Sequence, residues 1–121
     1  MIVLKTAREL NIMREAGRIS AGALRVAGMA VEPGVTTGEI DKLAYDYIIS
    51  QGAKPNFLHY NGYPATACIS INDEVIHGIP SKSRVIREGD IVSIDLAAFH
   101  GKSHIFPYSQ GIYILCTKNC S

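Results

Sequence analysis

The stretch "NDEVIHGIPSKSRVIREGDIVSIDLAAFHG", residues 72–101, decides the fold. Its last part, "IVSIDLAAF" (91–99), alternates between two sets of residues, as a β-strand does because successive side chains point to opposite faces. One set is apolar throughout: Val92, Ile94, Leu96 and Ala98. The other set contains Ser93 and Asp95. The pattern predicts a strand whose apolar face meets the core and whose other face carries Asp95.

The segments around this strand predict an α+β fold. "ATACISI" (65–71) alternates in the same way, and Val75–Ile79 is expected to form a short strand after the "NDE" turn. Upstream, residues 6–28 have helical apolar spacing, and Thr36 with Glu39 has the spacing of a capping box before a second helix that ends near Gly52. Two helices followed by antiparallel strands predict helices on one face of an antiparallel-rich sheet, with the other face left for a site.

Composition restricts the class of protein. The 121 residues are 47% hydrophobic and 19% charged, with a net charge of +1, so the basic excess expected of a nucleic-acid-binding protein is missing. No apolar run approaches the about 18 residues of a membrane span, and three cysteines do not make a disulfide framework. We therefore expect a single cytoplasmic domain without nucleic-acid or membrane partners.

Five residues are candidates for a site, each with an ordinary structural alternative. Asp95 lies within an apolar strand, where an ionised carboxylate needs a cation or several hydrogen-bond donors; it is either a ligand or a strand residue bonded to a nearby turn. His77, before Gly78 and Pro80, either points into a cleft or is exposed. Tyr60 and Tyr63 either line a pocket or pack beside a turn, and Cys68 is either a small core residue or a soft pocket wall.

Three segments carry a resemblance to a known family: "EPGVTTGEID", "FLHYNGYPATACISINDEVIHGIP" and "REGDIVSIDLAAF". Together they resemble the type I methionine aminopeptidases, over residues 1–101. The resemblance implies the N-terminal half of a pita-bread (creatinase/aminopeptidase-like) fold. It also implies a metalloaminopeptidase, a hydrolase that removes the initiator methionine from nascent proteins and uses two divalent ions, cobalt, manganese, iron or zinc.

The resemblance assigns roles by position. Asp95 in "SIDL" is similar to the family's first metal-binding aspartate, and His77 in "EVIHGIP" to the histidine that binds the substrate and steadies the reaction intermediate. Tyr60, Tyr63 and Cys68 are similar to residues that surround the methionine side chain. The expected partner is therefore a nascent peptide that begins with methionine.

The sequence departs from the family after residue 101. The family's second metal-binding aspartate lies in an "HGD" motif, for which this sequence has Phe106, and all eleven acidic residues here lie at or before Asp95. We interpret residues 102–121 as a divergent tail that resembles translation in a shifted reading frame. The chain is then expected to be truncated and inactive alone. A complementary half or self-association would cover its open sheet edge, and the alternative function is a non-catalytic pita-bread fragment that binds a peptide or a partner chain.

Overall fold

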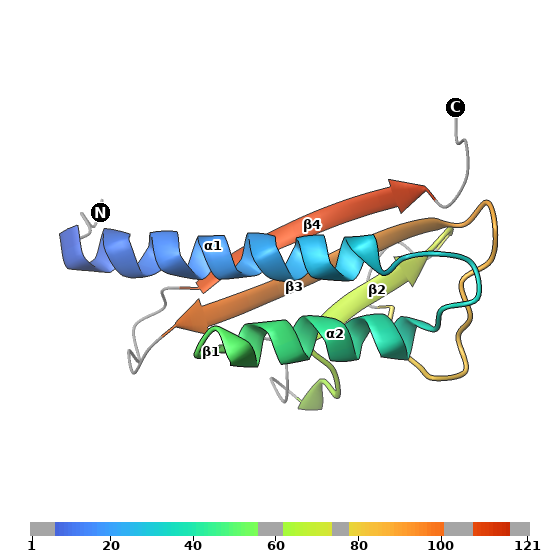
Figure 1. The fold of residues 1–121 in the computed structure, drawn as a ribbon, viewed down its shortest axis with the longest axis horizontal. Coiled ribbons are helices and arrows are strands. Elements are labelled where there is room, and N and C mark those ends of the chain that lie inside the picture. Colours follow the sequence, from blue (N-terminus) through green and yellow to red (C-terminus); the bar gives the residue numbers. More distant parts are fainter. Residues whose placement is uncertain (1–6, 56–61, 74–77, 101–107, 117–121) are drawn as a thin grey trace.

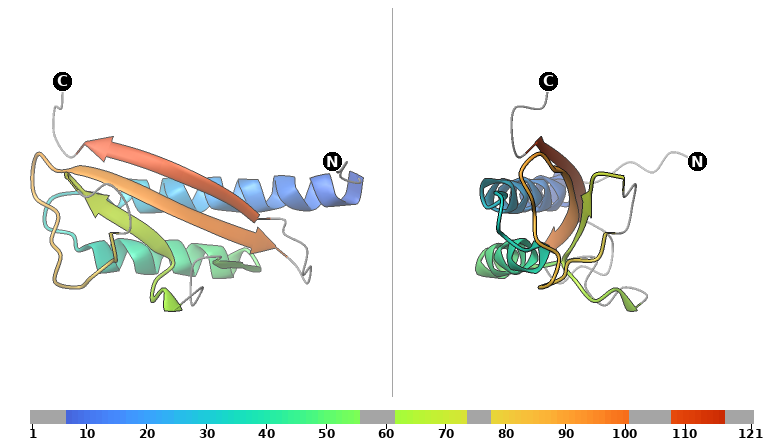
Figure 2. Two further views of the ribbon diagram at one scale, coloured as in Figure 1. Left: turned by 180° about the vertical axis from the view of Figure 1, so that it is seen from behind. Right: turned by 90° about the vertical axis from the view of Figure 1, so that its right-hand side faces the viewer.

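The computed structural model describes residues 7–55, 62–73, 78–100 and 108–116. Two helices, α1 (Ala7–Met29) and α2 (Thr37–Ser50), lie side by side over one face of an antiparallel sheet (Figures 1 and 2). The sheet contains β1 (Ala53–Pro55), β2 (Ala67–Ile71), β3 (Ile91–His100) and β4 (Tyr108–Cys116). The predicted α+β class, with helices on one face of an antiparallel-rich sheet, is confirmed.

Both helices form where the spacing of apolar residues predicts them. The Thr36 side chain accepts a hydrogen bond from the Glu39 amide at the start of α2, as the capping-box spacing predicts. The helix is followed by Gly52 at φ +75°, a left-handed conformation that glycine adopts without a steric penalty. Residue 6, where the first helical segment was predicted to begin, lies outside the described residues.

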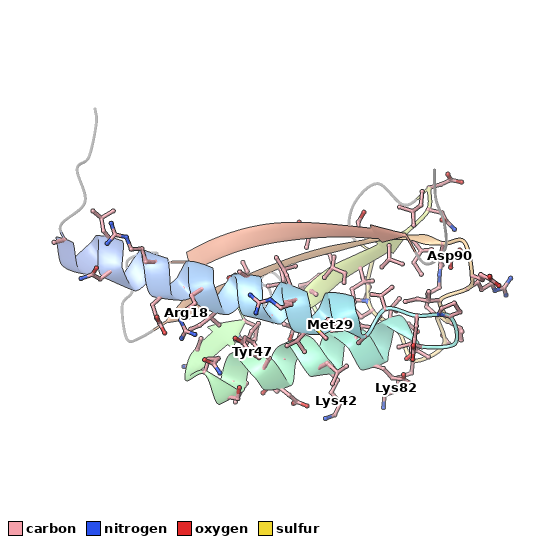
Figure 3. The ribbon with its side chains drawn as sticks, turned by 45° about the horizontal axis from the view of Figure 1, so that its top comes forward. Arg18, Met29, Lys42, Tyr47, Lys82 and Asp90 are labelled. Carbon is pink, nitrogen blue, oxygen red and sulfur yellow. The ribbon has the colours of Figure 1, made fainter. Side chains whose placement is uncertain are left out.

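The two helices approach closely at Gly22 of α1. A Cβ atom at this position would lie 2.1 Å from the Tyr47 hydroxyl oxygen, so the Tyr47 ring occupies the space that a side chain would fill. Figure 3 shows Tyr47 of α2 beside α1. The small residue therefore sets how closely the helices pack.

The sheet is organised around β3, the longest strand. On one side β3 pairs with β2, with Ile71 opposite Val92, and with β1 farther along, with Pro55 opposite Ala98. On its other side β3 pairs with β4 over its whole length except His100. Strands β1 and β4 were not predicted, because β1 is short and β4 lies in the tail that departs from the family.

The predicted extents of the other strands are partly corrected. The strand expected over 65–71 begins at Ala67, because the Ala65 and Thr66 positions form a bend before it. Of the short strand expected at Val75–Ile79, Gly78 and Ile79 are not in a strand, and residues 75–77 lie outside the described part.

The core lies between the helices and the sheet. The apolar set of β3 is fully buried, as predicted: Val92, Ile94, Leu96 and Ala98. It packs with buried residues of α1 and α2, including Ile19, Ile40 and Ile48. On the opposite face of β3 Ser93 and Asp95 are half-buried and Ala97 is buried, so this face is less open than the sequence suggests.

Candidate active site

Cys68 and Asp95 come together on the face of the sheet that turns away from the helices. They are directly opposite each other in the antiparallel pairing of β2 with β3. Side chains that face each other across an antiparallel pair have Cβ atoms about 4.5–5.5 Å apart, so the thiol and the carboxylate are neighbours. Both residues are half-buried. The sequence placed both on strands, and the register of the sheet makes them a pair.

Tyr63 joins this pair from the segment that precedes β2. Its hydroxyl donates a hydrogen bond to the Ala67 carbonyl oxygen over 2.8 Å, and a second hydrogen bond links the hydroxyl with the Cys68 thiol. Three of the five predicted site residues, Tyr63, Cys68 and Asp95, therefore lie together.

The surroundings keep Tyr63 and Cys68 in their neutral forms. Burial raises the pKa of the Tyr63 hydroxyl, and the bond to Cys68 raises it further. Burial also raises the pKa of the Cys68 thiol, and the nearby carboxylates of Asp95 and Asp41 act in the same direction, while the bond to Tyr63 opposes them. The two side chains thus form a neutral, polarizable surface beside a carboxylate.

Asp41 is a site neighbour that the sequence did not single out. It lies on α2 and accepts hydrogen bonds from the Ala67 amide (2.8 Å) and the Thr66 amide (3.4 Å). Burial raises the pKa of the Asp41 carboxyl, and these two hydrogen bonds oppose that effect. The sequence contains a signal for this position. Asp41 follows Thr37 by four residues, so it lies beside the buried residues of α2, most of which are apolar.

Ser70 and Gly78 form a second contact that the sequence did not reveal. The Ser70 hydroxyl, almost completely buried, accepts a hydrogen bond from the Gly78 amide over 3.2 Å. The Gly78 carbonyl in turn accepts from the Ile69 amide over 2.7 Å. These two bonds attach the chain at residue 78 to β2, two positions from Cys68 along the same face.

His77 and Tyr60 lie outside the described residues. Within residues 7–55, 62–73, 78–100 and 108–116, no three His, Cys, Asp or Glu side chains are grouped as a metal centre would require. Both Asp41 oxygens already accept hydrogen bonds from backbone amides, so Asp41 is engaged elsewhere and does not complete a metal centre with Asp95. The described residues alone do not fit the two-ion centre that the resemblance implies.

Comparison with known proteins defines the class of protein. Residues 11–105 match metallopeptidase family M24, and the chain belongs to this family. A methionine aminopeptidase of Clostridium acetobutylicum is 51% identical over 98 residues, which are 81% of this chain and 39% of that protein. Methionine aminopeptidase 1 of Bacillus subtilis is 49% identical over 107 residues, 85% of this chain and 43% of that protein. The predicted resemblance is confirmed, and the chain spans less than half the length of these relatives.

Solved structures agree on the fold. The methionine aminopeptidase of Thermotoga maritima has a TM-score of 0.88 and 35% sequence identity, and the match covers 96% of this chain and 45% of that one. The prolidase of Pyrococcus furiosus, at 22% identity, shares the fold with a TM-score of 0.78 over 98% of this chain and 32% of that one. The predicted pita-bread fold is therefore confirmed for the part that this chain represents. No helix among the described residues is long and apolar enough to cross a membrane.

Proposed function

We propose that this chain forms part of a metal-dependent methionine aminopeptidase acting on nascent peptides that begin with methionine, in the cytoplasm. The pairing of Cys68 with Asp95, with Tyr63 bonded to Cys68, carries the proposal. A neutral thiol and a neutral phenol suit the thioether of a methionine side chain, because sulfur makes favourable contacts with polarizable groups and aromatic rings. Asp95 lies next to this surface. This position suits a metal ligand, because the metal must be close to the scissile bond of the bound methionine.

His77 and Tyr60 complete the proposal from the sequence. His77 directly precedes Gly78 in the sequence, and the backbone of Gly78 is bonded to β2 near Cys68. We assign His77 to binding the substrate and steadying the reaction intermediate, and Tyr60 to the methionine pocket with Tyr63 and Cys68. Asp95 is assigned to one divalent ion, cobalt, manganese, iron or zinc.

As a polypeptide of 121 residues, the chain is proposed to be inactive alone. Asp95 is the last acidic residue of the sequence, and the register of β3 with β4 places an isoleucine, Ile112, opposite it. The side chain of an isoleucine has no atom that can ligate a metal ion, so the sequence of β4 supplies no side-chain ligand at that position. The further ligands would come from a complementary half of the enzyme.

A complementation assay tests this function. The chain is mixed with a polypeptide carrying the part of the Bacillus subtilis relative outside the match, and methionine release from a Met-Ala-Ser peptide is followed with each divalent ion. We expect no release by the chain alone and release by the mixture. Asp95→Asn should abolish release, whereas Asp46→Asn, which removes an exposed carboxylate paired with Lys42, should not. Equal activity of the Asp95→Asn mixture and the wild-type mixture would rule out the metal role.

The second candidate function is a non-catalytic fragment that binds a peptide or a partner chain. It is favoured by the lack of a three-ligand metal group among the described residues. Calorimetric titration with manganese or zinc separates the two functions. The second function requires peptide binding without stoichiometric metal uptake in the mixture, whereas the first requires two ions per assembled site.

The tail is proposed to arise from a shift of reading frame after residue 101. The family match ends at residue 105, so most of the tail lies outside it. Sequencing the gene across codons 99–102 tests this. Restoring one or two nucleotides should yield an "HGD" motif and a second half, and a gene without such a frame would contradict the hypothesis.

A further inference from the structure

The Asp41 carboxylate is a half-buried acid for which the proposed function has no role. Burying a carboxylate without compensation is unfavourable, and here the compensation comes from two backbone amides at the start of β2. Because Asp41 belongs to α2 and the amides belong to Thr66 and Ala67, the contact joins a helix to the strand that carries Cys68.

Ala67 is held at both of its backbone polar groups. Its amide donates to Asp41 over 2.8 Å, and its carbonyl oxygen accepts from the Tyr63 hydroxyl over 2.8 Å. In an antiparallel pair the amide and carbonyl of one residue point to the same side of the strand. Both groups of Ala67 therefore point away from β3, toward the outer edge of β2, where Asp41 and Tyr63 meet them.

Tyr63 reaches Cys68 through the same hydroxyl group. The hydroxyl that donates to Ala67 also bonds the Cys68 thiol. A displacement of the Ala67 carbonyl would move the hydroxyl and separate the ring from the thiol. The hydrogen bonds thus form a continuous line from α2, through the Ala67 backbone and Tyr63, to Cys68 opposite Asp95.

We propose that Asp41 is a positioning residue for the candidate methionine pocket: by accepting from the Ala67 amide, it holds the Ala67 carbonyl where that oxygen fixes Tyr63 against Cys68. The naming of the pocket rests on the proposed function. The positioning of Tyr63 by Asp41 does not depend on it.

Nuclear magnetic resonance of the 121-residue chain provides the test, because it needs no activity. Two quantities are measured: the nuclear Overhauser contact between the Tyr63 ring and the Cys68 β-protons, and the exchange protection of the Ala67 amide. In Asp41→Ala both should fall together, with Ala67 protection reduced by about tenfold or more, because a hydrogen bond to a charged group is lost. In Asp41→Asn, which keeps an oxygen for Ala67, both should be largely retained.

A control separates positioning from general loss of stability. Ile86 is fully buried and lies in the segment between Gly78 and β3, and its backbone bonds to Gly34 and Val35, so Ile86→Val lowers stability without removing a hydrogen bond of Asp41, Ala67 or Tyr63. Each variant is measured at the denaturant concentration that gives both variants the same unfolded fraction. Under these conditions the Tyr63 contact should persist in Ile86→Val and be lost in Asp41→Ala. If Asp41→Ala does not fold, Asp41→Asn provides the test. The proposal requires that any change in Ala67 protection in this variant is accompanied by a proportional change in the Tyr63 contact.

Titration with L-methioninamide distinguishes this inference from the proposed function. We expect shifts at Tyr63 and Cys68 in the wild type, with binding about tenfold weaker in Asp41→Ala. Coupled loss of Ala67 protection and the Tyr63 contact, without any methioninamide shift in the wild type, would support the positioning role and count against the methionine pocket. A Tyr63 contact that persists when Ala67 protection is lost, in either variant, would overturn the inference.

Discussion

Substituting Gly78 with alanine should destabilise the chain strongly, because its backbone lies directly against β2. A Cβ atom at this position would lie 2.1 Å from the Ile69 carbonyl oxygen and 2.8 Å from the Ser70 Cα atom. Both atoms belong to backbone, so a flexible side chain cannot move aside to relieve the contact. The segment at residue 78 must separate from β2.

The magnitude follows from the two hydrogen bonds that this separation breaks. The Ile69 amide loses the Gly78 carbonyl at 2.7 Å, and the Gly78 amide loses the Ser70 hydroxyl at 3.2 Å. A net hydrogen bond contributes about 1 kcal/mol, and a buried group left without a partner costs about 1–3 kcal/mol. We expect the free energy of unfolding to fall by about 2–4 kcal/mol, a large share of the about 5–15 kcal/mol of a typical domain.

Urea unfolding followed by far-ultraviolet circular dichroism measures this change, with stability taken from linear extrapolation. Gly52→Ala is the matched control: Gly52 has φ +75° and no atom within 4 Å of an added Cβ, so only backbone strain of about 1–2 kcal/mol is introduced. In Ser70→Ala the free energy of unfolding should fall by about 1–3 kcal/mol, because the hydrogen bond from the Gly78 amide is lost. If Gly78→Ala is no less stable than Gly52→Ala, the close contact with β2 does not carry the stability assigned to it.

Three further predictions concern the helices and the turn before β3. Thr36→Ala removes the cap of α2 and should lower the free energy of unfolding by about 1 kcal/mol in the same assay, while Thr36→Ser should be nearly neutral. Hydrogen bonds from the Arg87 amide and from Asn72 lower the pKa of Asp90 in the folded chain. The ionised Asp90 therefore stabilises the fold fully above the ordinary carboxyl pKa, and this stabilisation is lost as the pH falls through the lowered pKa of the folded state. Asp90→Asn should therefore flatten the decline in stability below pH 4 or so, and an unchanged decline would contradict this assignment. Gly22→Ala should leave stability within about 1 kcal/mol of wild type, since the gain in helix propensity offsets displacement of the Tyr47 ring; an unmoved Tyr47 resonance would show that the ring does not fill this space.

The features that the sequence predicts correctly are those governed by neighbouring residues. The capping box at Thr36 depends on a residue three positions away, and the two faces of β3 follow from alternation within one strand. In each case the interaction involves residues a few positions apart, so it can be predicted from the local sequence. The buried set on β3 was therefore identified correctly, residue by residue.

The contacts that the sequence missed depend on register and on distant segments. Cys68 and Asp95 become neighbours only because β2 and β3 pair in one register, and a shift by one residue would turn one of them to the opposite face. Asp41 meets Ala67 across 26 positions of sequence. Helical spacing shows that Asp41 lies on a buried stripe of α2, but it does not show which amide the acid contacts.

These long-range contacts also determine where the sheet can extend. At the outer edge of β2 the amide and carbonyl of Ala67 are bonded to Asp41 and Tyr63, and the Ile69 amide is bonded to Gly78, so these groups are not available to another strand. Over the described part of the chain, β4 pairs with β3 alone, and residues 108–116 carry no charged side chain that would discourage a further strand. If a complementary half or a second copy associates through a sheet edge, as we propose, β4 is the edge that the described part of the chain leaves for it. Because β4 lies beside Asp95, a strand added there would approach the candidate site from the side opposite Tyr63 and Cys68.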